Sequence, residues 1–524
     1  MSDRQLSATG KRYAIATPHR AATEAGVAAF EDGGNAVDAA LAAAITLAVV
    51  YPHMCGVGGD LFALVQALNG QTIALNASGA APIAIDVDAI RDAGDTMPEH
   101  GPLTITVPGA VSGWAALAKL GADLAFERAF QPAIAHARDG VPVASSLASG
   151  LAWEPSRLFA DPGMREVFGR DNTPLAKGDM LLQPALAATL EAVAGEGPSA
   201  LYGGEVGARL VAELRATGSP MSLQDLADHR AELDSPIAAR YRDLHVSVVP
   251  PNSQGFALLE MLLAAERLEI DPDPLGVDAA LLAEVFAAAS ADRDRHNADP
   301  RLARVPVGTL LDEGHIAALC DEVRTARVRI AHRPAGDTIA LVTVDGEGRA
   351  VSLIQSLASG FGSGILEPST GIICHSRGAA FSLDPQSPNV LAGGKRPAHT
   401  LMPVLVHRGG RLTAAMGSMG GGGQPQINFQ NLVRLFDLGM DPGAVLAAPR
   451  WLMGGMELHP GRLVELEGRV SRKVRRSLEA AGFALTVLGE LDEGVGHAQL
   501  VRVGEDGTLD AATDPRADGE ARAG

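Results

Sequence analysis

The chain has 524 residues, of which 47% are hydrophobic and 20% are charged, and its formal net charge is −19. This composition is typical of a globular protein, and the length predicts two domains or one large multilayer domain. So strong a negative charge argues against nucleic acid or an anionic membrane as a partner, because both would be repelled.

Targeting signals are not expected. Residues 1–13 contain Arg4, Lys11 and Arg12 but no apolar stretch, which disfavours a signal peptide. The apolar run 39–50 is too short to span a bilayer. The three cysteines are far apart, which suits a reducing compartment and excludes a CxxC metal site. We therefore expect a cytoplasmic protein.

The first hundred residues combine helices with a hairpin. A helix is expected over 21–30, and Asn35 is expected to cap a second helix over 36–50, which should be buried because its residues are small and apolar. Strands over 61–68 and 72–76 alternate around an Asn-Gly turn. The glycines of 56–59 follow a helical pattern instead of a strand, so no dinucleotide site is predicted.

The middle of the chain is mainly helical. Helices dominate from 115 to about 235, and a short strand at 246–249 leads through a Pro-Pro-Asn-Ser-Gln-Gly turn into a helix over 256–267. Asp292 and His296 could be metal ligands, but the arginines between them favour an ion network. No metal site is therefore predicted.

The last third opens with a second hairpin. β-favouring residues fill 338–345 and 350–356 on either side of a Gly-rich turn, and the preceding residues 331–336 are polar and rich in helix breakers, as an accessible cleavage site should be. A glycine run lies at 420–423, and 518–524 are expected to be a frayed tail. Hairpins alternating with helices suggest two sheets between helical layers.

Several collinear segments resemble the gamma-glutamyltranspeptidase family of N-terminal-nucleophile hydrolases. They are the hairpin 338–356, the turn 361–365, the glycine run with Gln424-Pro425, the block 51–62 and the segment 106–114. The resemblance covers roughly residues 14–517. It implies an α/β fold, a four-layer αββα sandwich, and cleavage between Asp337 and Thr338. The products would be a large subunit, 1–337, and a small subunit, 338–524, which together form one domain. A homo-oligomer of this heterodimer is compatible with the resemblance.

The resemblance also implies a mechanism. Thr338 would be the nucleophile, and its α-amino group, with a reference pKa near 8, would be the base once Asp337 is cut away. Ser356 stands where the family keeps a hydroxyl that hydrogen-bonds the nucleophile. Gly420 and Gly421 align with paired glycines whose backbone N–H groups stabilise the oxyanion. Nucleophile, base and donors all come from protein, so no cofactor is expected.

The substrate-binding residues depart from the family pattern. Ser78 replaces an arginine that holds the α-carboxylate of a γ-glutamyl group, and Ala380 replaces an acid that holds its amino group. Arg377 replaces an amide, and His399 and Thr400 replace two serines. Arg377 and His399 are the nearest expected cations and would suit an acyl group with a carboxylate. The alternative is that Arg377 pairs with an acidic surface residue.

These variant motifs resemble a cytoplasmic branch of the family that includes oxamate amidohydrolases. We predict a self-processing amidohydrolase that acts on a small-molecule amide, either γ-glutamyl or a short carboxylate-bearing one, through a threonine acyl-enzyme. The segment 381–395 is too short for the lid loop of many glutamyl enzymes, which predicts a more open pocket. Three alternatives remain: an enzyme specific for oxamate, an acylase for a larger acyl group, and a non-catalytic scaffold with the same fold.

Overall fold

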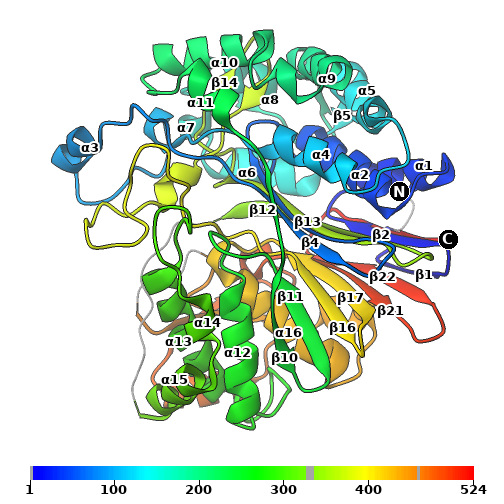
Figure 1. The fold of residues 1–524 in the computed structure, drawn as a ribbon, viewed down its shortest axis with the longest axis vertical. Coiled ribbons are helices and arrows are strands. Elements are labelled where there is room, and N and C mark those ends of the chain that lie inside the picture. Colours follow the sequence, from blue (N-terminus) through cyan, green and yellow to red (C-terminus); the bar gives the residue numbers. More distant parts are fainter. Residues whose placement is uncertain (1–3, 326–335, 457–460) are drawn as a thin grey trace.

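The computed structural model describes residues 4–325, 336–456 and 461–524. Two seven-stranded sheets stack face to face in the middle of the molecule (Figure 1). The first sheet has the order β23 (Glu520–Ala523), β2 (Tyr13–Thr17), β12 (Asp337–Asp345), β13 (Ala350–Ala358), β3 (Asp60–Gln66), β4 (Thr72–Ala77) and β9 (Glu232–Asp234). The second has the order β1 (Ser7–Gly10), β22 (Leu509–Thr513), β21 (Ala498–Val503), β17 (Arg411–Ser418), β16 (Val404–Arg408), β11 (Leu244–Val248) and β10 (Ile237–Tyr241).

Helices cover the outer face of each sheet (Figure 1). The first sheet packs under α1 (Arg20–Glu31), α2 (Ala36–Val50), α4 (Ala110–Lys119), α5 (Gln131–Asp139) and α9 (Pro184–Glu196). The second packs under α12 (Phe256–Arg267), α13 (Ala279–His296), α15 (Glu313–Thr325) and α16 (Gln424–Phe436). A third apolar cluster, which includes Phe62, Val342 and Leu405, fills the space between the sheets. The predicted αββα sandwich is confirmed.

Smaller elements surround these layers. The helices are α3 (Val87–Ala93), α6 (Ser145–Trp153), α7 (Pro155–Leu158), α8 (Pro162–Phe168), α10 (Glu205–Ala216), α11 (Leu223–Asp228), α14 (Val307–Leu310), α17 (Pro442–Ala447) and α18 (Arg472–Ala480). The strands are β5 (Val141–Pro142), β6 (Gly169–Arg170), β7 (Thr173–Pro174), β8 (Met180–Leu181), β14 (Leu366–Glu367), β15 (Ile372–Ile373), β18 (Trp451–Met453), β19 (Leu463–Glu467) and β20 (Ala484–Leu488).

Each of the two sheets combines strands from both sides of the Asp337–Thr338 bond. In the first sheet, β12 lies between β2 and β13, and β13 pairs in turn with β3. In the second, β11 pairs with β16 and β1 pairs with β22. Both sheets therefore contain strands from residues 1–337 and from residues 338–524. The lead-in 331–335 lies outside the described residues.

The carboxyl-terminal segment is ordered, so the expectation of a frayed tail was wrong. Residues 520–523 form β23, which pairs with β2 in register from Ala14↔Ala523 to Thr17↔Glu520. The Gly524 carbonyl accepts a hydrogen bond from the Arg12 backbone N–H at 2.6 Å. Without β23, the backbone of β2 would have no hydrogen-bond partner along that edge. Pairing with β2 therefore orders residues 520–523, although their own sequence has only a weak preference for a strand.

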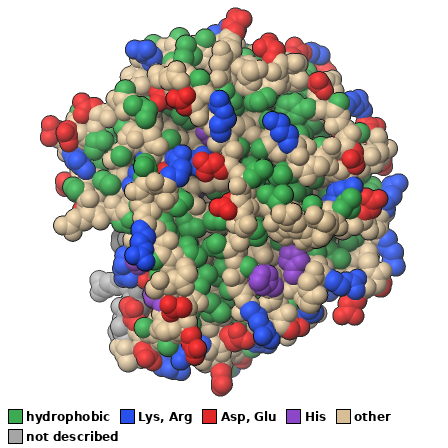
Figure 2. All heavy atoms as spheres, viewed as in Figure 1, with side chains coloured by type: hydrophobic (Ala, Val, Ile, Leu, Met, Phe, Trp, Pro, Cys, Tyr) green, Lys and Arg blue, Asp and Glu red, His purple; other side chains and the backbone are tan. Residues whose placement is uncertain are grey.

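The surface mixes both signs of charge. On the face shown in Figure 2, Lys and Arg side chains are interspersed with Asp and Glu side chains. No helix in the described part of the chain is long and apolar enough to cross a membrane.

The first turn of α2 yields a stability prediction. The Asn35 side chain accepts hydrogen bonds from the N–H groups of Val37 and Asp38, and it donates to Gly121 and Asp123. Asn35→Ala should lower the free energy of unfolding by about 1–2 kcal/mol, because it removes a helix cap that also ties a neighbouring loop. Denaturant unfolding would measure this. The exposed Thr9→Ala serves as a control, and a loss no larger than the control's would contradict the role of the cap.

Candidate active site

The β12–β13 hairpin brings two hydroxyls and one peptide bond together. Thr338 lies opposite Ser356 in the register, and a bulge separates Asp337 from Thr338. The Thr338 hydroxyl donates to Ser356 Oγ at 3.1 Å, and the Ser356 hydroxyl donates to the Asp337 carbonyl oxygen at 2.5 Å. The Ala358 N–H donates to Ser356 Oγ at 2.8 Å, which fixes that hydroxyl further. Ser356 thus hydrogen-bonds both the hydroxyl of Thr338, the predicted nucleophile, and the carbonyl oxygen of the Asp337–Thr338 peptide bond.

The glycine loop 420–423, between β17 and α16, packs against Gly336, just before the Asp337–Thr338 bond. Gly420 has φ +146° and Gly421 has φ +50°, conformations that side chains disfavour. A Cβ added to Gly336 would lie 2.7 Å from the Gly421 Cα, so the two backbones approach closely. The Gln254 amide donates to the Gly421 carbonyl at 2.9 Å, and Arg293 Nη1 donates to the Gly422 carbonyl at 2.8 Å. These side chains fix the loop beside the scissile segment.

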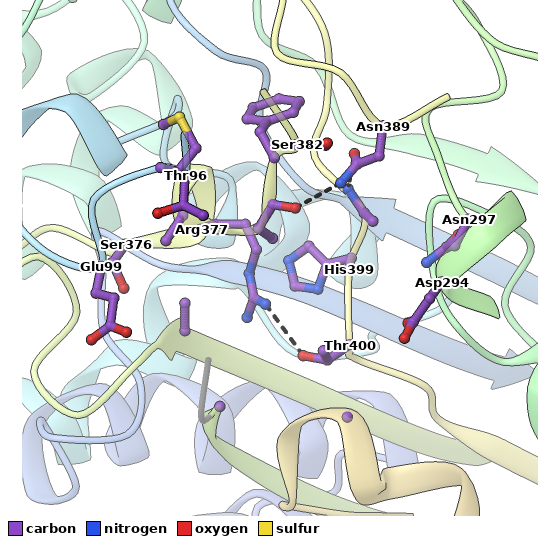
Figure 3. A pocket seen from close by; sticks show the side chains of 18 of the residues that line it. Thr96, Glu99, Asp294, Asn297, Ser376, Arg377, Ser382, Asn389, His399 and Thr400 are labelled. Atoms are coloured by element: carbon purple, nitrogen blue, oxygen red, sulfur yellow. Dashed lines mark hydrogen bonds between the residues drawn. The ribbon is translucent and has the colours of Figure 1, made fainter. Parts of the chain in front are cut away.

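Arg377 lies on the other side of Ser356. The residue is only 4% exposed, and it donates to Thr400 Oγ1 at 3.3 Å (Figure 3). It also donates to Ser356 Oγ at 3.3 Å. Burial lowers the pKa of Arg377 to about 10, so the guanidinium is still charged at neutral pH. Among the residues that the structure describes, no carboxylate forms an ion pair with it. The alternative that Arg377 pairs with an acidic surface residue is therefore wrong.

His399 is a neutral imidazole, which corrects the charge predicted for it. Burial, together with the positive charge of Arg377, lowers the pKa of His399 to about 3. Its Nδ1 accepts a weak hydrogen bond from the Leu401 N–H at 3.4 Å, and its Nε2 lies 3.1 Å from Asp60 Oδ2. These contacts select the tautomer protonated on Nε2. His399 therefore orients a carboxylate from behind and does not supply a cation.

Asp60 is the buried carboxylate behind this site. Burial disfavours its charge, but His375, the hydrogen bond from His399 and the charge of Arg377 outweigh burial and hold its pKa below the usual value. The Gly79 N–H also donates to Asp60 Oδ1 at 3.2 Å. Asp60 thus provides negative potential near Arg377 without neutralising it by direct contact.

A cavity of about 360 Å³ opens next to these groups. Arg377, His399, Thr400, Gly336 and Gly422 line its inner end. In Figure 3 the Arg377 side chain extends toward Thr400, with Asp294 and Asn297 approaching from the α13 side and Thr96 and Glu99 from the opposite side. Further lining residues, Phe381, Ser382, Leu383, Ser387 and Asn389, come from the short segment where a lid was expected to be missing.

Thr338 and Ser356 are not among the described residues that line this cavity. Both side chains are buried, with exposed fractions of 0% and 1%. Gly336 and Ala358 line the cavity in their place. In this uncleaved chain, the residues before Thr338 therefore separate the predicted nucleophile from the cavity.

Ser78 does not have the predicted position at the cavity. It is fully buried and not among the lining residues, and its hydroxyl donates to Asn76 Oδ1 at 2.7 Å. The Asn252 amide donates to Ser78 Oγ at 3.2 Å. Ser78 thus belongs to a hydrogen-bond network with the half-buried Asn76 and the buried Asn252, and the geometry does not support its contact with substrate.

Sequence reasoning missed three residues that shape the site: Asp60, Gln254 and Arg293. Gln254 lies in the Pro-Pro-Asn-Ser-Gln-Gly turn, and Asp60 directly follows the glycines of 56–59. Both segments were recognised in the sequence, but neither residue was assigned a role. Arg293 was assigned only to an ion network. It contacts Asp294 at 2.8 Å, but its exposed side-chain fraction is only 3% and it also reaches the glycine loop.

Comparison with known proteins identifies the family. The profile described as gamma-glutamyltranspeptidase matches residues 22–524. The chain belongs to this family. It is 35% identical to the glutathione hydrolase-like YwrD proenzyme of Bacillus subtilis, over 98% of this chain and 99% of that protein. It is 36% identical to the oxamate amidohydrolase proenzyme of Klebsiella pneumoniae, over 96% and 97% of the two chains. The solved cephalosporin acylase of Bacillus halodurans shares the fold with a TM-score of 0.92 and 31% identity, covering 100% of this chain and 98% of that one.

The neutral state of His399 predicts a pH effect on stability. Its folded pKa of about 3 lies below the unfolded value near 6.5, so unfolding takes up a proton below pH 6.5 and stability falls as pH decreases. Between about pH 6 and pH 5, His399→Gln should reduce the slope of unfolding free energy against pH by about 1.2 kcal/mol per pH unit.

Denaturant unfolding at several pH values would measure the slope, with the exposed His245→Gln as control. A slope unchanged in the His399 variant would show that His399 is not held neutral in the folded state.

Proposed function

We propose that this family member is a self-processing amidohydrolase with an N-terminal threonine, and that its acyl group carries a carboxylate. The observation that supports this most directly is Arg377, a buried guanidinium with no ion-pair partner among the described residues. It donates to Ser356 Oγ, and Ser356 Oγ in turn accepts from the Thr338 hydroxyl. A buried cation beside a nucleophile, with no carboxylate in direct contact among the described residues, is suited to binding an anionic substrate.

Processing begins with attack of the Thr338 oxygen on the Asp337 carbonyl carbon. The Ser356 hydroxyl donates to the carbonyl oxygen and stabilises the charge that develops on it. The bond from the Asp337 carbon to the Thr338 nitrogen breaks as that nitrogen takes the proton that the Thr338 hydroxyl loses, which leaves an ester. Water hydrolyses the ester and frees the Thr338 hydroxyl and amine. The products are the large subunit, 1–337, and the small subunit, 338–524.

Turnover uses the new amine as base. The free α-amino group takes the Thr338 hydroxyl proton as the oxygen attacks the substrate amide carbon. The backbone N–H groups of Gly420 and Gly421 stabilise the oxyanion, and the amide nitrogen leaves with the proton from the ammonium group. Water, or an acceptor amine, then attacks the acyl-enzyme ester and releases the acid or a new amide. Apart from the water or acceptor amine that resolves the ester, every group in this cycle belongs to the protein or the substrate.

The position of Arg377 favours a short acyl group. Since Ser356 contacts both the guanidinium and the nucleophile, a carboxylate on Arg377 lies close to the carbonyl under attack. In oxamate the carboxylate is bonded directly to the amide carbon, whereas in a γ-glutamyl group three carbons separate the two. The charged residues that the family uses for a glutamate zwitterion are replaced by Ser78 and Ala380. The 36% identical relative named for oxamate supports the same substrate class.

A second candidate is an acylase for a larger carboxylate-bearing acyl group. The cavity of about 360 Å³ falls within the range of pockets for drug-sized ligands and exceeds what oxamate needs. One solved relative that shares the fold over the whole chain is a cephalosporin acylase. In this case Arg377 would still bind the carboxylate, and the remaining cavity would accommodate the rest of the acyl group.

Intact mass of freshly purified protein would test the self-processing step. We expect two fragments from the wild type, separated between Asp337 and Thr338, and one uncut chain from Thr338→Ala. Thr338→Ser keeps a hydroxyl and should still cut. A single uncut chain from the wild type would overturn the proposal and favour the non-catalytic scaffold.

Ser356→Ala should slow processing by about 100-fold, because it removes the donor to the Asp337 carbonyl and the acceptor of the Thr338 hydroxyl. The cut fraction would be followed by mass spectrometry after synthesis. Ser352→Ala is a matched control on the same strand, since its buried hydroxyl donates to the Met416 carbonyl at 2.8 Å and contacts no part of the scissile segment. Equal rates in the two variants would exclude a role of Ser356 in the cut.

Arg377→Gln should lower kcat/KM for oxamate by about 10- to 100-fold, since a charge-assisted hydrogen bond contributes about 1.5–3 kcal/mol. Hydrolysis of oxamide, which has no carboxylate, should change far less. Ammonia release would measure both, with γ-glutamyl and longer carboxylate-bearing amides in the same panel. Arg91→Gln is the control, because Arg91 donates to the Leu383 carbonyl near the cavity but does not line it. Equal losses on charged and neutral substrates would contradict carboxylate binding by Arg377.

A further inference from the structure

Three helices that cover the second sheet bring one side chain each to a common point. Glu260 comes from α12, Asp292 from α13 and His315 from α15. His315 Nε2 lies 2.7 Å from Asp292 Oδ2 and 3.6 Å from Glu260 Oε1. One ligand atom from each residue lies within 4.8 Å of the other two. The cluster is distinct from the candidate active site, whose cavity it does not line.

Glu260 is the unusual member of this cluster. Its exposed fraction is 0%, and neither of its carboxylate oxygens has a hydrogen-bond partner among the described residues. The residues beside it in α12, Leu259 and Met261, are buried and apolar. Burying an ionised carboxylate without hydrogen bonds costs several kcal/mol, so such a group is either protonated or compensated by a ligand. The His315 imidazole at 3.6 Å is beyond normal hydrogen-bond length.

We propose that Glu260, Asp292 and His315 bind one divalent transition-metal ion, with zinc the best match. Zinc takes histidine nitrogen and carboxylate oxygen at about 2.0–2.2 Å in tetrahedral geometry, which places ligand atoms roughly 3.3–3.5 Å apart. The distances from His315 Nε2 to Asp292 Oδ2 and to Glu260 Oε1, 2.7 and 3.6 Å, lie on either side of that value. All three ligand atoms lie within 4.8 Å of one another. An imidazole with only two carboxylates is a poor site for calcium or magnesium, which prefer oxygen ligands.

The fourth position would be filled by water. The His315 side chain is 25% exposed, so the metal can reach the site from solvent, whereas Glu260 closes it on the protein side. Asp292 Oδ2 faces His315, while its Oδ1 accepts a hydrogen bond from Arg295 at 2.6 Å. That contact orients the Asp292 carboxylate, as groups behind metal ligands do.

A protonated His315 that bridges the two carboxylates is the competing explanation. Its Nε2 would donate to Asp292 at 2.7 Å, but at 3.6 Å from Glu260 Oε1 it would leave the Glu260 carboxylate without a hydrogen bond. A metal ion would compensate the whole carboxylate. It would also join three helices next to the glycine loop, because Arg293, which follows Asp292 on α13, donates to Gln254 Oε1 and to the Gly422 carbonyl.

The sequence-based expectation of no metal near Asp292–His296 considered only ligands within one helix. His296, which was weighed there as a ligand, is not part of this cluster. Glu260 and His315 come from other helices, and their separation in the sequence matches no compact metal-binding motif.

Zinc binding to the full-length protein would test the proposal. Protein treated with EDTA and then dialysed would be titrated with Zn²⁺ by calorimetry, and Co²⁺ would be used as a substitute whose visible spectrum reports tetrahedral coordination. We expect one equivalent to bind and to raise the Tm. His315→Gln and Glu260→Gln should each weaken binding by roughly tenfold or more. His296→Gln, on α13 but outside the cluster, should bind as the wild type does.

Two outcomes would overturn the proposal. Absence of stoichiometric binding to the wild type would mean that a proton, not a metal, holds the cluster. Binding that persists in His315→Gln would place the metal elsewhere. His315 is partly exposed, so its variant is expected to fold, and circular dichroism would confirm this before each titration.

Discussion

The hydrogen bonds that Ser356 makes across the β12–β13 pair determine the geometry of the candidate site. The register places Ser356 opposite Thr338, and the bulge at Asp337 turns the preceding carbonyl toward the same hydroxyl. Because β13 also pairs with β3, Asp60 lies next to Ser356 in the register, which places the buried carboxylate behind the site. A change of register by one residue would move the Ser356 side chain to the other face of the sheet and disconnect all of these groups.

Burial, more than ion pairing, determines which groups around the cavity are charged. Asp60 is held ionised by hydrogen-bond donors and by the nearby Arg377, while His399 stays neutral because it is buried. Arg377 is thus left as a cation whose described hydrogen-bond partners are hydroxyls. Desolvated charge of this kind interacts strongly with an anion that excludes water, since the local dielectric is low. This is a more selective arrangement than an exposed arginine would provide.

Much of the architecture could be predicted from the sequence, and less of the site. The helix capped by Asn35 and the two hairpins were recognisable from local periodicity and turn residues, because these signals involve neighbouring positions. The roles of Gln254, Arg293 and Asp60 were not, since each depends on contacts between segments far apart in the chain. The charge of His399 was predicted wrongly because burial, which sets its pKa, is a tertiary property. The β-strand at 520–523 was missed because pairing with β2 decides its structure, not its own composition.

The order β23-β2-β12 has a consequence for any cut between Asp337 and Thr338. Strand β2 would then belong to the large subunit, while β23 and β12 on its two sides would belong to the small one. The two chains would be interlaced, since one strand of the first is hydrogen-bonded along both edges by the second. Separation of the subunits would require the sheet to open in its interior, so dissociation and unfolding would be the same event. The processed enzyme should behave as one cooperative unit even though it consists of two polypeptides.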